Sequence, residues 1–285
     1  MSNEKIADWV EAFLVCAGKT TLPISAIESA VTKKFGLNSH DASFVVRNLN
    51  QRSKILKARY PFKIHNLAVE VKANFESTPY TALSCLAAAL TDEWCRPDLD
   101  RPRGIPELFE EIACDAMIKI FGEGAQGLRF GWPSSIGRPR EFNDAISWLA
   151  EKMNIKVGAS YRPPRMKDGG VDVVVWRPFA DNKSGFPILL GQVTIEKEYD
   201  HKADDIDLRI WSGWLSMDVE PTVVLAVPWT GLDKEQWTRI NSRALLLDRI
   251  RIASLLPEIM SEEKSYFEKC TDLIRHVRAG LVLDD

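Results

Sequence analysis

Cysteine and histidine are scarce in this chain, and neither is spaced like a metal-binding set. The 285 residues include five cysteines without a CxxC pair and four histidines without an HxH or HxxxH pair. This spacing excludes the common zinc motifs. An odd number of scattered thiols is typical of a reduced protein, so we expect a cytoplasmic location.

Long apolar runs are also missing. No stretch of eighteen apolar residues occurs, so no membrane-spanning helix is expected. The opening residues, MSNEKIADWVEAF, are charged from residue 4 and lack the apolar centre of a secretion signal. The sequence GEGAQG at 122–127 has glycines like a phosphate loop, but no Lys-Ser/Thr pair follows it. Nucleotide binding at that loop is therefore excluded.

The overall composition is that of an ordinary globular protein, with 45% hydrophobic and 27% charged residues. The length allows one large or two modest domains. The net charge is -3, but it is unevenly distributed, because residues 33–63 contain eight basic residues and one acidic residue. A basic segment in an otherwise acidic chain indicates contact with nucleic acid.

Residues 1–75 have the pattern of a small helical domain. Helices are predicted at about 6–16 and 24–35, and a third is predicted in HDASFVVRNLNQRSKIL, with a short alternating hairpin after it. This is the order of a winged helix-turn-helix. The candidate nucleic-acid-binding residues on the third helix and hairpin are Arg47, Arg52, Lys54, Lys57, Arg59 and Lys63. The alternative is a solvated basic face on a protein-interaction module.

Residues 76–104 are interpreted as a linker, with one connecting helix followed by the Pro- and Arg-rich RPDLDRPRGIP. Residues 105–285 then alternate helices and apolar strands, ending in further helices. This order predicts an α/β domain with a mixed central sheet flanked by helices, preceded by the small helical domain. The segment 122–140 between the first two helices is expected to be a glycine-rich loop.

The segment GGVDVVVWRPFADNKSGFPILLGQVTIEK, residues 169–197, is predicted to be a hairpin with one polar residue in each apolar strand. Burying a polar side chain without a partner is costly. If the hairpin is symmetric about Asn182, then Asp172 and Gln192 face each other across the two strands. A carboxylate, an amide oxygen and a nearby backbone carbonyl are hard oxygen ligands of the kind that magnesium prefers.

These elements together resemble the restriction-endonuclease-like PD-(D/E)XK nuclease superfamily over roughly residues 105–230. The resemblance rests on a helix carrying FEE, on GGVD at the head of one strand and on GQVT at the end of the next. It implies a site for Mg²⁺ (or Mn²⁺) formed by Asp172, Gln192, the Val193 carbonyl and Glu110. Glu111 is the alternative to Glu110.

The sequence departs from the family pattern at one position. The family has a lysine two residues after the second-strand ligand, and this chain has Thr194 there. Lys197 is the candidate replacement, with Lys202 as an alternative. The loss of this lysine is equally consistent with an inactive site.

The resemblance implies a magnesium-dependent DNA endonuclease, acting in prokaryotic restriction or anti-phage defence, with DNA and a second copy or a defence partner as binding partners. In the loop at 122–140, Arg129, Arg138 and Arg140 are candidate phosphate contacts, unless they only meet water. Tryptophans such as Trp132 are conceivable stacking surfaces for bases, although most tryptophans are core residues. Two alternatives remain: an inactive nuclease-fold adaptor, or a DNA-binding protein that acts through its first domain.

Overall fold

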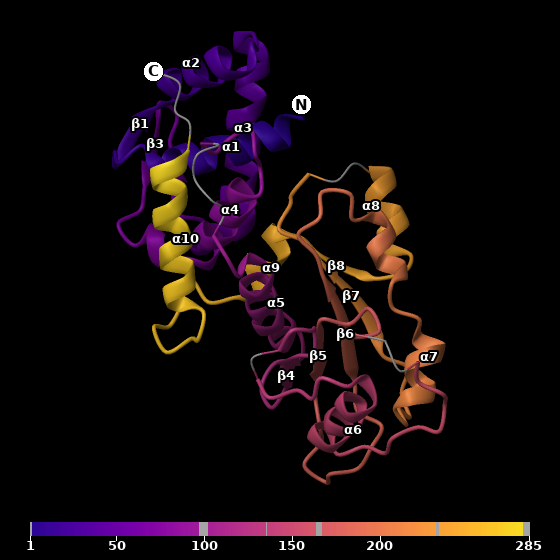
Figure 1. Ribbon diagram of the computed structural model, residues 1–285. Helices are drawn as coiled ribbons and strands as arrows, with labels where there is room; N and C mark the ends of the chain where they lie inside the picture. Colours follow the sequence, from indigo (N-terminus) through magenta and orange to yellow (C-terminus); the bar gives the residue numbers. More distant parts are fainter. Residues whose placement is uncertain (1, 97–101, 135, 164–166, 232–233, 282–285) are drawn as a thin grey trace. The chain divides into compact units, whose positions relative to one another are not determined.

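The computed structural model describes residues 2–96, 102–134, 136–163, 167–231 and 234–281, and the chain forms two compact units (Figure 1). Unit 1 comprises Met1–Leu108, Pro228–Gly231 and Asp248–Asp285, and unit 2 comprises Phe109–Val227 and Leu232–Leu247. The predicted division into residues 1–75 and 105–285 needs correction, because the chain from Asp248 onward belongs with the N-terminal residues.

The N-terminal part of unit 1 contains the predicted helices and hairpin. Its elements are α1 (Asn3–Cys16), β1 (Thr21–Pro23), α2 (Ile24–Phe35), α3 (Ser39–Leu56), η1 (Lys57–Arg59), β2 (Phe62–Ile64) and β3 (Ala68–Val71). The strands form an antiparallel sheet in the order β1-β3-β2. Gly36 ends α2 in the left-handed conformation, and the Asn38 side chain caps α3 by accepting from the Asp41 amide at 2.9 Å.

The helix that was predicted to be part of a linker is in fact core. All residues of α4 (Pro79–Ala89), which follows η2 (Phe75–Ser77), are buried. Both α9 (Arg249–Leu255) and α10 (Phe267–Gly280) pack against α4. A helix without a polar face can be stable only where it is surrounded. The middle of the predicted linker, residues 97–101, lies outside the described residues.

A buried ionic cluster joins the segments of unit 1. Arg52 Nη1 lies 2.7 Å from Asp8 and 2.9 Å from Glu11. Arg249 pairs with the same two acids, and the hydroxyl groups of Tyr60 and Tyr80 donate to Glu11. Arg52 is only 3% exposed. The prediction that Arg52 contacts nucleic acid is therefore wrong, because its guanidinium is used inside the fold.

Unit 2 is a mixed α/β fold, as predicted. Its elements are α5 (Ile105–Phe121, from Phe109 on), β4 (Gln126–Arg129), α6 (Phe142–Met153), β5 (Val173–Trp176), β6 (Ile188–Val193), η3 (Asp200–Asp204), α7 (Leu208–Trp214), β7 (Thr222–Ala226), α8 (Lys234–Asn241) and β8 (Leu245–Leu247). The sheet order is β4-β5-β6-β7-β8, antiparallel from β4 to β6 and parallel from β6 to β8 (Figure 1).

Two glycines allow α5 to approach this sheet closely. A Cβ at Gly127 in β4 would lie 2.9 Å from Ile118 of α5, and a Cβ at Gly191 in β6 would lie 2.9 Å from Met117. This close approach brings Met117 and Ile118 of α5 directly against β6 and β4. Within the described residues, none of the helices has the length and apolar character needed to cross a bilayer.

Candidate functional site

The predicted hairpin register is confirmed. Val173 pairs with Gly191 and Val174 with Leu190, and the paired residues end there, because the Asp172 N–H also meets Gly191, which is already the partner of Val173. The predicted pair of Asp172 and Gln192 lies one residue beyond this ladder. The backbone of Asp172 is fixed on both sides, because its N–H donates to the Gly191 carbonyl at 2.8 Å and its carbonyl accepts from Phe130 and Gly131 at 2.6 and 3.0 Å.

The two polar side chains of the hairpin have different partners. Asp172 Oδ2 accepts a hydrogen bond from the Val193 amide at 2.7 Å. Gln192 Oε1 is buried and has no hydrogen-bond partner among the described residues. An unsatisfied buried amide oxygen costs free energy, and native structures usually supply a water or an ion in such a place.

Glu110 of α5 is the second acid at this end of β5. Its Oε2 accepts from Arg129, the last residue of β4, at 2.8 Å from Nε and 2.6 Å from Nη2. Glu111 lies farther from the same guanidinium, with Oε1 3.9 Å from Nη1. Glu110 is also the helix acid whose charge raises the pKa of Asp172, which favours Glu110 over Glu111 as the third site residue.

Gly131 marks the point where the two carboxylates converge. A Cβ at this residue would lie 3.3 Å from Asp172 Oδ1 and 3.4 Å from Glu110 Oε2. Any larger residue would press against both oxygens. Glycine at this position therefore keeps open the small space that both carboxylates face.

The GGVD sequence has a similar steric origin. Gly169 and Gly170 have φ values of 65° and 79°, a region that favours glycine. A Cβ at Gly170 would overlap the carbonyl oxygen of Asp205, and one at Gly169 would lie 2.9 Å from the Trp214 ring. Gly170 thus allows the segment around Asp205, and Gly169 allows the Trp214 ring, to lie against the residues that lead into Asp172.

Burial raises the pKa of Asp172 to about 8, and the negative charges of Glu110 and Asp168 add to this effect. The Val193 amide and Lys202 act in the opposite direction, but they do not outweigh the loss of hydration. At neutral pH the carboxyl group therefore holds a proton unless a cation stabilises its ionised form.

Lys202 of η3 is the cation whose charge lowers the pKa of Asp172. It was the alternative to Lys197 in the sequence-based prediction. Its Nζ lies 3.1 Å from Glu196 Oε1 and 3.5 Å from Asp205 Oδ2. Burial lowers the pKa of Lys202, but these two acids outweigh burial and raise it. Lys197 has an exposed side chain. The structure therefore favours Lys202 over Lys197 as the lysine of this site.

The position that the family fills with lysine has a structural role in this chain. Thr194 is 5% exposed, and its hydroxyl accepts from the Glu196 amide at 3.1 Å. The Thr194 amide donates to the Ala226 carbonyl of β7 at 3.0 Å. Thr194 thus shapes the turn that leads from β6 toward η3, where Lys202 lies.

The residues present fit a hard divalent cation in their donor chemistry. Among the described residues, no group of three or more His, Cys, Asp or Glu side chains is arranged to hold a metal ion. A cation at this site would therefore need the free amide oxygen of Gln192 and a backbone oxygen in addition to Asp172. Glu110 would have to share its carboxylate between the cation and Arg129. Oxygen-only donors of this kind suit Mg²⁺ or Mn²⁺.

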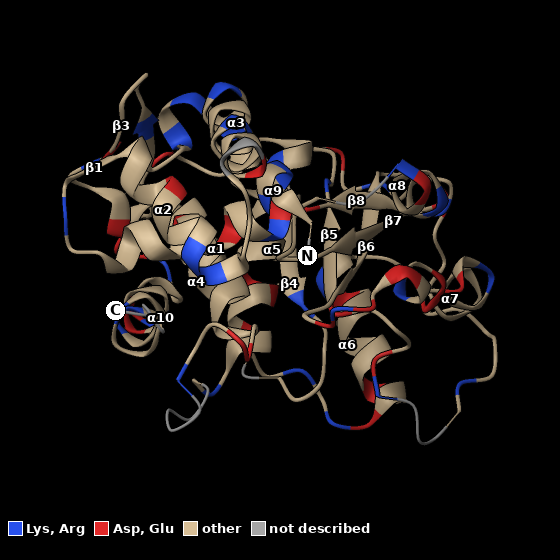
Figure 2. Cartoon of the chain, turned by 90° about the horizontal axis from the view of Figure 1, so that it is seen from above, with Lys and Arg blue, Asp and Glu red and all other residues tan. Residues whose placement is uncertain are grey.

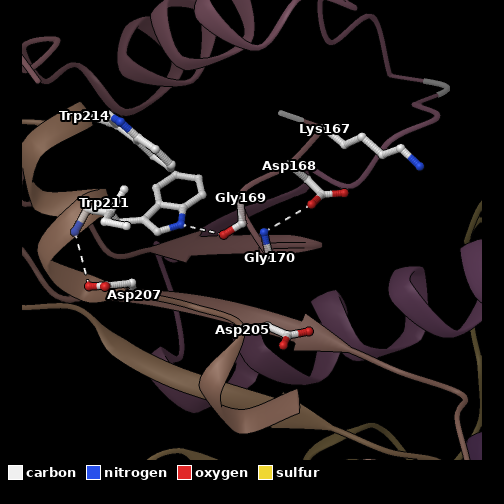
Figure 3. A pocket seen from close by; sticks show the side chains of 9 residues that line it. Lys167, Asp168, Gly169, Gly170, Asp205, Asp207, Trp211 and Trp214 are labelled. Carbon is white, nitrogen blue, oxygen red and sulfur yellow. Dashed lines mark hydrogen bonds between the residues drawn. The ribbon is translucent and has the colours of Figure 1, made fainter. Parts of the chain in front are cut away.

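A cavity of about 490 Å³ lies beside this site. It is lined by Lys167, Asp168, Gly169, Gly170, Asp205, Asp207, Ile210, Trp211 and Trp214. Figure 3 shows the Trp211 indole bonded to the Gly169 carbonyl, at 3.0 Å, and Asp168 bonded to the Gly170 amide. Asp168 and Asp205 were not predicted as site residues. The paired glycines of GGVD are the sequence signal that could have indicated that another segment of the chain lies close to the residues before Asp172.

Two of the three arginines predicted to contact phosphate are used internally. Arg129 and Arg138 are 6% and 4% exposed. Arg129 holds Glu110, while Arg138 donates to the carbonyl groups of Pro139 and Lys167. The prediction of phosphate contacts for these two residues is therefore wrong, and Arg140, which is exposed, stays a candidate.

Four of the basic residues predicted on the third helix and hairpin are exposed. Figure 2 shows lysine and arginine along α3 of unit 1. Arg47, Lys54, Lys57 and Lys63 reach the surface, although Lys63 lies 3.1 Å from Glu70. Arg59 is half-buried and donates to the Leu256 carbonyl at 2.7 Å. We refer to these four exposed residues, Arg47 and Lys54 of α3, Lys57 of η1 and Lys63 of β2, as the α3 basic face.

Comparison with known proteins gives one structural likeness to report. The chain is similar to the MspJI restriction endonuclease, solved in complex with a 27-mer oligonucleotide, at 15% identity and a TM-score of 0.33. The match covers 60% of this chain and 31% of that chain. No family model and no curated protein matches the sequence. We assign unit 2 to the α/β class from its five-stranded sheet and its helices, and not from this likeness.

Proposed function

We propose that this protein is a magnesium-dependent DNA endonuclease with its active centre at Asp172, Gln192 and Glu110. The observation that supports it best is the group of polar atoms at the end of the β5–β6 hairpin. There Asp172 accepts from the Val193 amide, and the neighbouring Gln192 has a buried amide oxygen without a partner among the described residues. A structural role leaves both groups unexplained, because apolar residues would pack there at lower cost.

In this proposal the cation is held by Asp172, the Gln192 amide oxygen and the Val193 carbonyl, with Glu110 as a further ligand. A bound magnesium ion polarises the phosphoryl oxygen and lowers the pKa of a water molecule. The protein's part is to fix the donors before the substrate binds. The hydrogen bonds from the Asp172 backbone to the segments on either side provide this rigidity.

Lys202 is the proposed partner for the negative charge that develops on the phosphate. Its ammonium group is held by Glu196 and Asp205 and is close enough to lower the pKa of Asp172. A lysine from η3 would thus replace the one that the family carries at the position of Thr194. In this role Lys202 takes precedence over Lys197.

The α3 basic face is the proposed DNA-binding surface. We interpret the first three helices with their antiparallel sheet as a winged-helix domain, whose third helix and hairpin carry these cations. Four exposed cations contribute a sequence-independent attraction to phosphates. A role in prokaryotic restriction or anti-phage defence, and pairing with a second copy or a defence partner, are proposed from the family resemblance alone.

A plasmid-nicking assay tests the proposal and its choice of lysine together. Supercoiled plasmid is incubated with Mg²⁺ and the wild type, Asp172→Asn, Lys202→Met or Lys197→Met. We expect loss of nicking in Asp172→Asn, a reduction of about 100-fold or more in Lys202→Met, and a nearly unchanged rate in Lys197→Met. Equal rates for the two lysine variants would contradict the assignment of Lys202.

One observation favours a second function, that of a nuclease-fold DNA-binding adaptor without catalysis. Glu110 is engaged by Arg129 through two contacts, and the usual lysine position is occupied by Thr194. An adaptor would bind plasmid through the α3 basic face without nicking it at any divalent-ion concentration. The same assay with a gel-shift measurement separates the two functions.

A further inference from the structure

The loop after β4 carries an exposed tryptophan one residue after Gly131. The Gly131 amide donates to the Asp172 carbonyl, and a Cβ on Gly131 would lie 3.3 Å from Asp172 Oδ1 and 3.4 Å from Glu110 Oε2. The next residue, Trp132, is 37% exposed. No other tryptophan among the described residues is as exposed. A single exposed aromatic residue is ordinary on a protein surface, so its surroundings decide whether it has a role.

Those surroundings fix the indole in place. The Arg138 guanidinium lies 4.4 Å from the centre of the Phe130 ring and 5.6 Å from that of Trp132. Arg138 is itself buried and is anchored by its bonds to the Pro139 and Lys167 carbonyls. Cation–π contacts of this kind hold an aromatic ring against a cation. Trp132 is thus supported from within the protein while part of its ring remains exposed to solvent.

A fixed, partly exposed aromatic ring is suited to stacking on a flat ligand at low entropic cost. Beside a phosphodiester-cleaving site, the available flat groups are the bases of the substrate. Base–aromatic stacking contributes about 1–3 kcal/mol per base and does not depend on base identity. Within a regular duplex both faces of each base are covered by neighbouring bases, so only an unstacked base can offer a face to this ring.

We propose that Trp132 stacks on an unpaired nucleobase next to the scissile phosphate, which makes single-stranded or locally opened nucleic acid the substrate class. This inference rests on the proposed function, because the site beside Trp132 is the proposed cleavage site. The residue's role is to position the substrate and to select for an exposed base. Arg138 supports the ring and does not contact the substrate.

Binding of short labelled oligonucleotides in EDTA tests this inference. The probes are a thymidine oligomer and an oligomer of equal length made of abasic residues, measured by fluorescence anisotropy. Trp132→Ala should weaken binding of the thymidine oligomer about 5- to 100-fold, which corresponds to the stacking energy of one base. It should leave binding of the abasic oligomer unchanged. Trp132→Phe keeps an aromatic ring and should retain most of the affinity.

Phe179 provides a matched control. It is 50% exposed and lies in the turn of the β5–β6 hairpin, at the opposite end of these strands from Asp172. Phe179→Ala should bind both oligomers like the wild type. Thermal unfolding of each variant identifies any loss of affinity that arises from misfolding. If Trp132→Ala misfolds, the oligomer comparison is made with Trp132→Leu, which keeps an apolar side chain of substantial size but has no aromatic ring.

The outcomes separate this inference from the proposed function. If Trp132→Ala binds the thymidine oligomer as tightly as the wild type does, or if the wild type binds neither oligomer, the stacking role is refuted. In the first of these two cases, nicking that depends on Asp172 would still support the proposed function. If instead Trp132→Ala selectively loses binding of the thymidine oligomer while the wild type does not nick DNA, the stacking contact is supported and the proposed cleavage reaction is refuted.

Discussion

At the scale of single residues, Asp172 is constrained by several neighbours at once. Its backbone is bonded to the segments on both sides, its side chain accepts from the Val193 amide, and Glu110 and Asp168 add negative charge nearby. Burial, together with the charges of Glu110 and Asp168, stabilises the protonated carboxyl group and outweighs the opposite effect of the Val193 amide on the pKa. Perturbed acids of this kind are concentrated at functional sites.

The raised pKa of Asp172 predicts a pH dependence of stability in the absence of divalent cations. The pKa is about 8 in the fold and about 3.9 in the unfolded chain. Between these values the native state holds a proton that the unfolded state has lost, so the free energy of unfolding falls as the pH rises through this window and levels off above pH 8. Acid conditions therefore favour the native state at this residue.

Asp172→Asn removes this dependence because asparagine does not ionise. In EDTA, the wild type should lose stability between pH 5 and pH 8.5 and the variant should not. The free energy of unfolding of the variant minus that of the wild type should therefore rise by a few kcal/mol, on the order of 4, over this interval. Urea unfolding of both proteins at the two pH values measures the difference. A stability gap that does not change with pH would show that Asp172 is ionised in the fold.

The sequence predicts individual site residues only where the backbone pattern determines their position. The register of β5 against β6 could be predicted because a hairpin register follows from its turn. The roles of Arg52 and Arg138 could not be predicted, because a basic residue on a helix or loop looks the same in sequence whether it meets solvent or a buried acid. Lys202 lies on a short 3₁₀ turn that has no periodic pattern to fix its direction.

At the scale of elements, the glycines determine how closely the segments of unit 2 approach. Gly127 and Gly191 admit α5 to the sheet, and Gly170 admits the segment around Asp205 to the residues before β5. The strand β4 was missed in the sequence because it is short and has glycine within it, a composition that is more typical of loops. By contrast, the long helices α5 and α6 end at Phe121 and begin at Phe142, so they border the segment 122–140 as predicted.

Gly170 and Gly137 allow the steric contribution to be measured. Both have positive φ, at 79° and 80°, but nothing lies within 4 Å of a Cβ at Gly137. Gly137→Ala should therefore cost about 1 kcal/mol, which is the conformational penalty alone. Gly170→Ala adds an overlap with the Asp205 carbonyl and should cost about 2–4 kcal/mol. Equal losses in urea unfolding would show that the segment around Asp205 moves freely away from Gly170.

At the scale of the whole molecule, unit 1 is assembled from three stretches of sequence. Its buried cluster takes Asp8 and Glu11 from α1, Arg52 from α3, Thr230 from the chain after β7, and Arg249 from α9. Charges that are far apart in sequence give no local signal that they will meet. For this reason the sequence predicts one domain over residues 105–285, whereas the residues from Asp248 onward belong to unit 1.

Two arginines of α3 separate stability from DNA binding. Arg52→Met leaves part of a buried ionic cluster unpaired and should cost about 3–5 kcal/mol. Arg47, which is exposed with its guanidinium 4.7 Å from the Phe44 ring centre, is the matched control. Arg47→Met should change stability by about 0.5 kcal/mol or less, while weakening DNA binding and its salt dependence. Unfolding curves and salt-dependent gel shifts measure the two effects, and a stable Arg52→Met protein would contradict the assigned role of the cluster.

The central claim is that Asp172 belongs to a centre that hydrolyses phosphodiester bonds. The most direct measurement is the rate of Mg²⁺-dependent plasmid nicking by the wild type and by Asp172→Asn at equal protein concentration, each shown to be folded by its unfolding curve. We predict nicking by the wild type that is lost in EDTA, and a rate at least about 100-fold lower for the variant. Nicking by the variant at the wild-type rate, or a wild type that never nicks DNA, would contradict the claim.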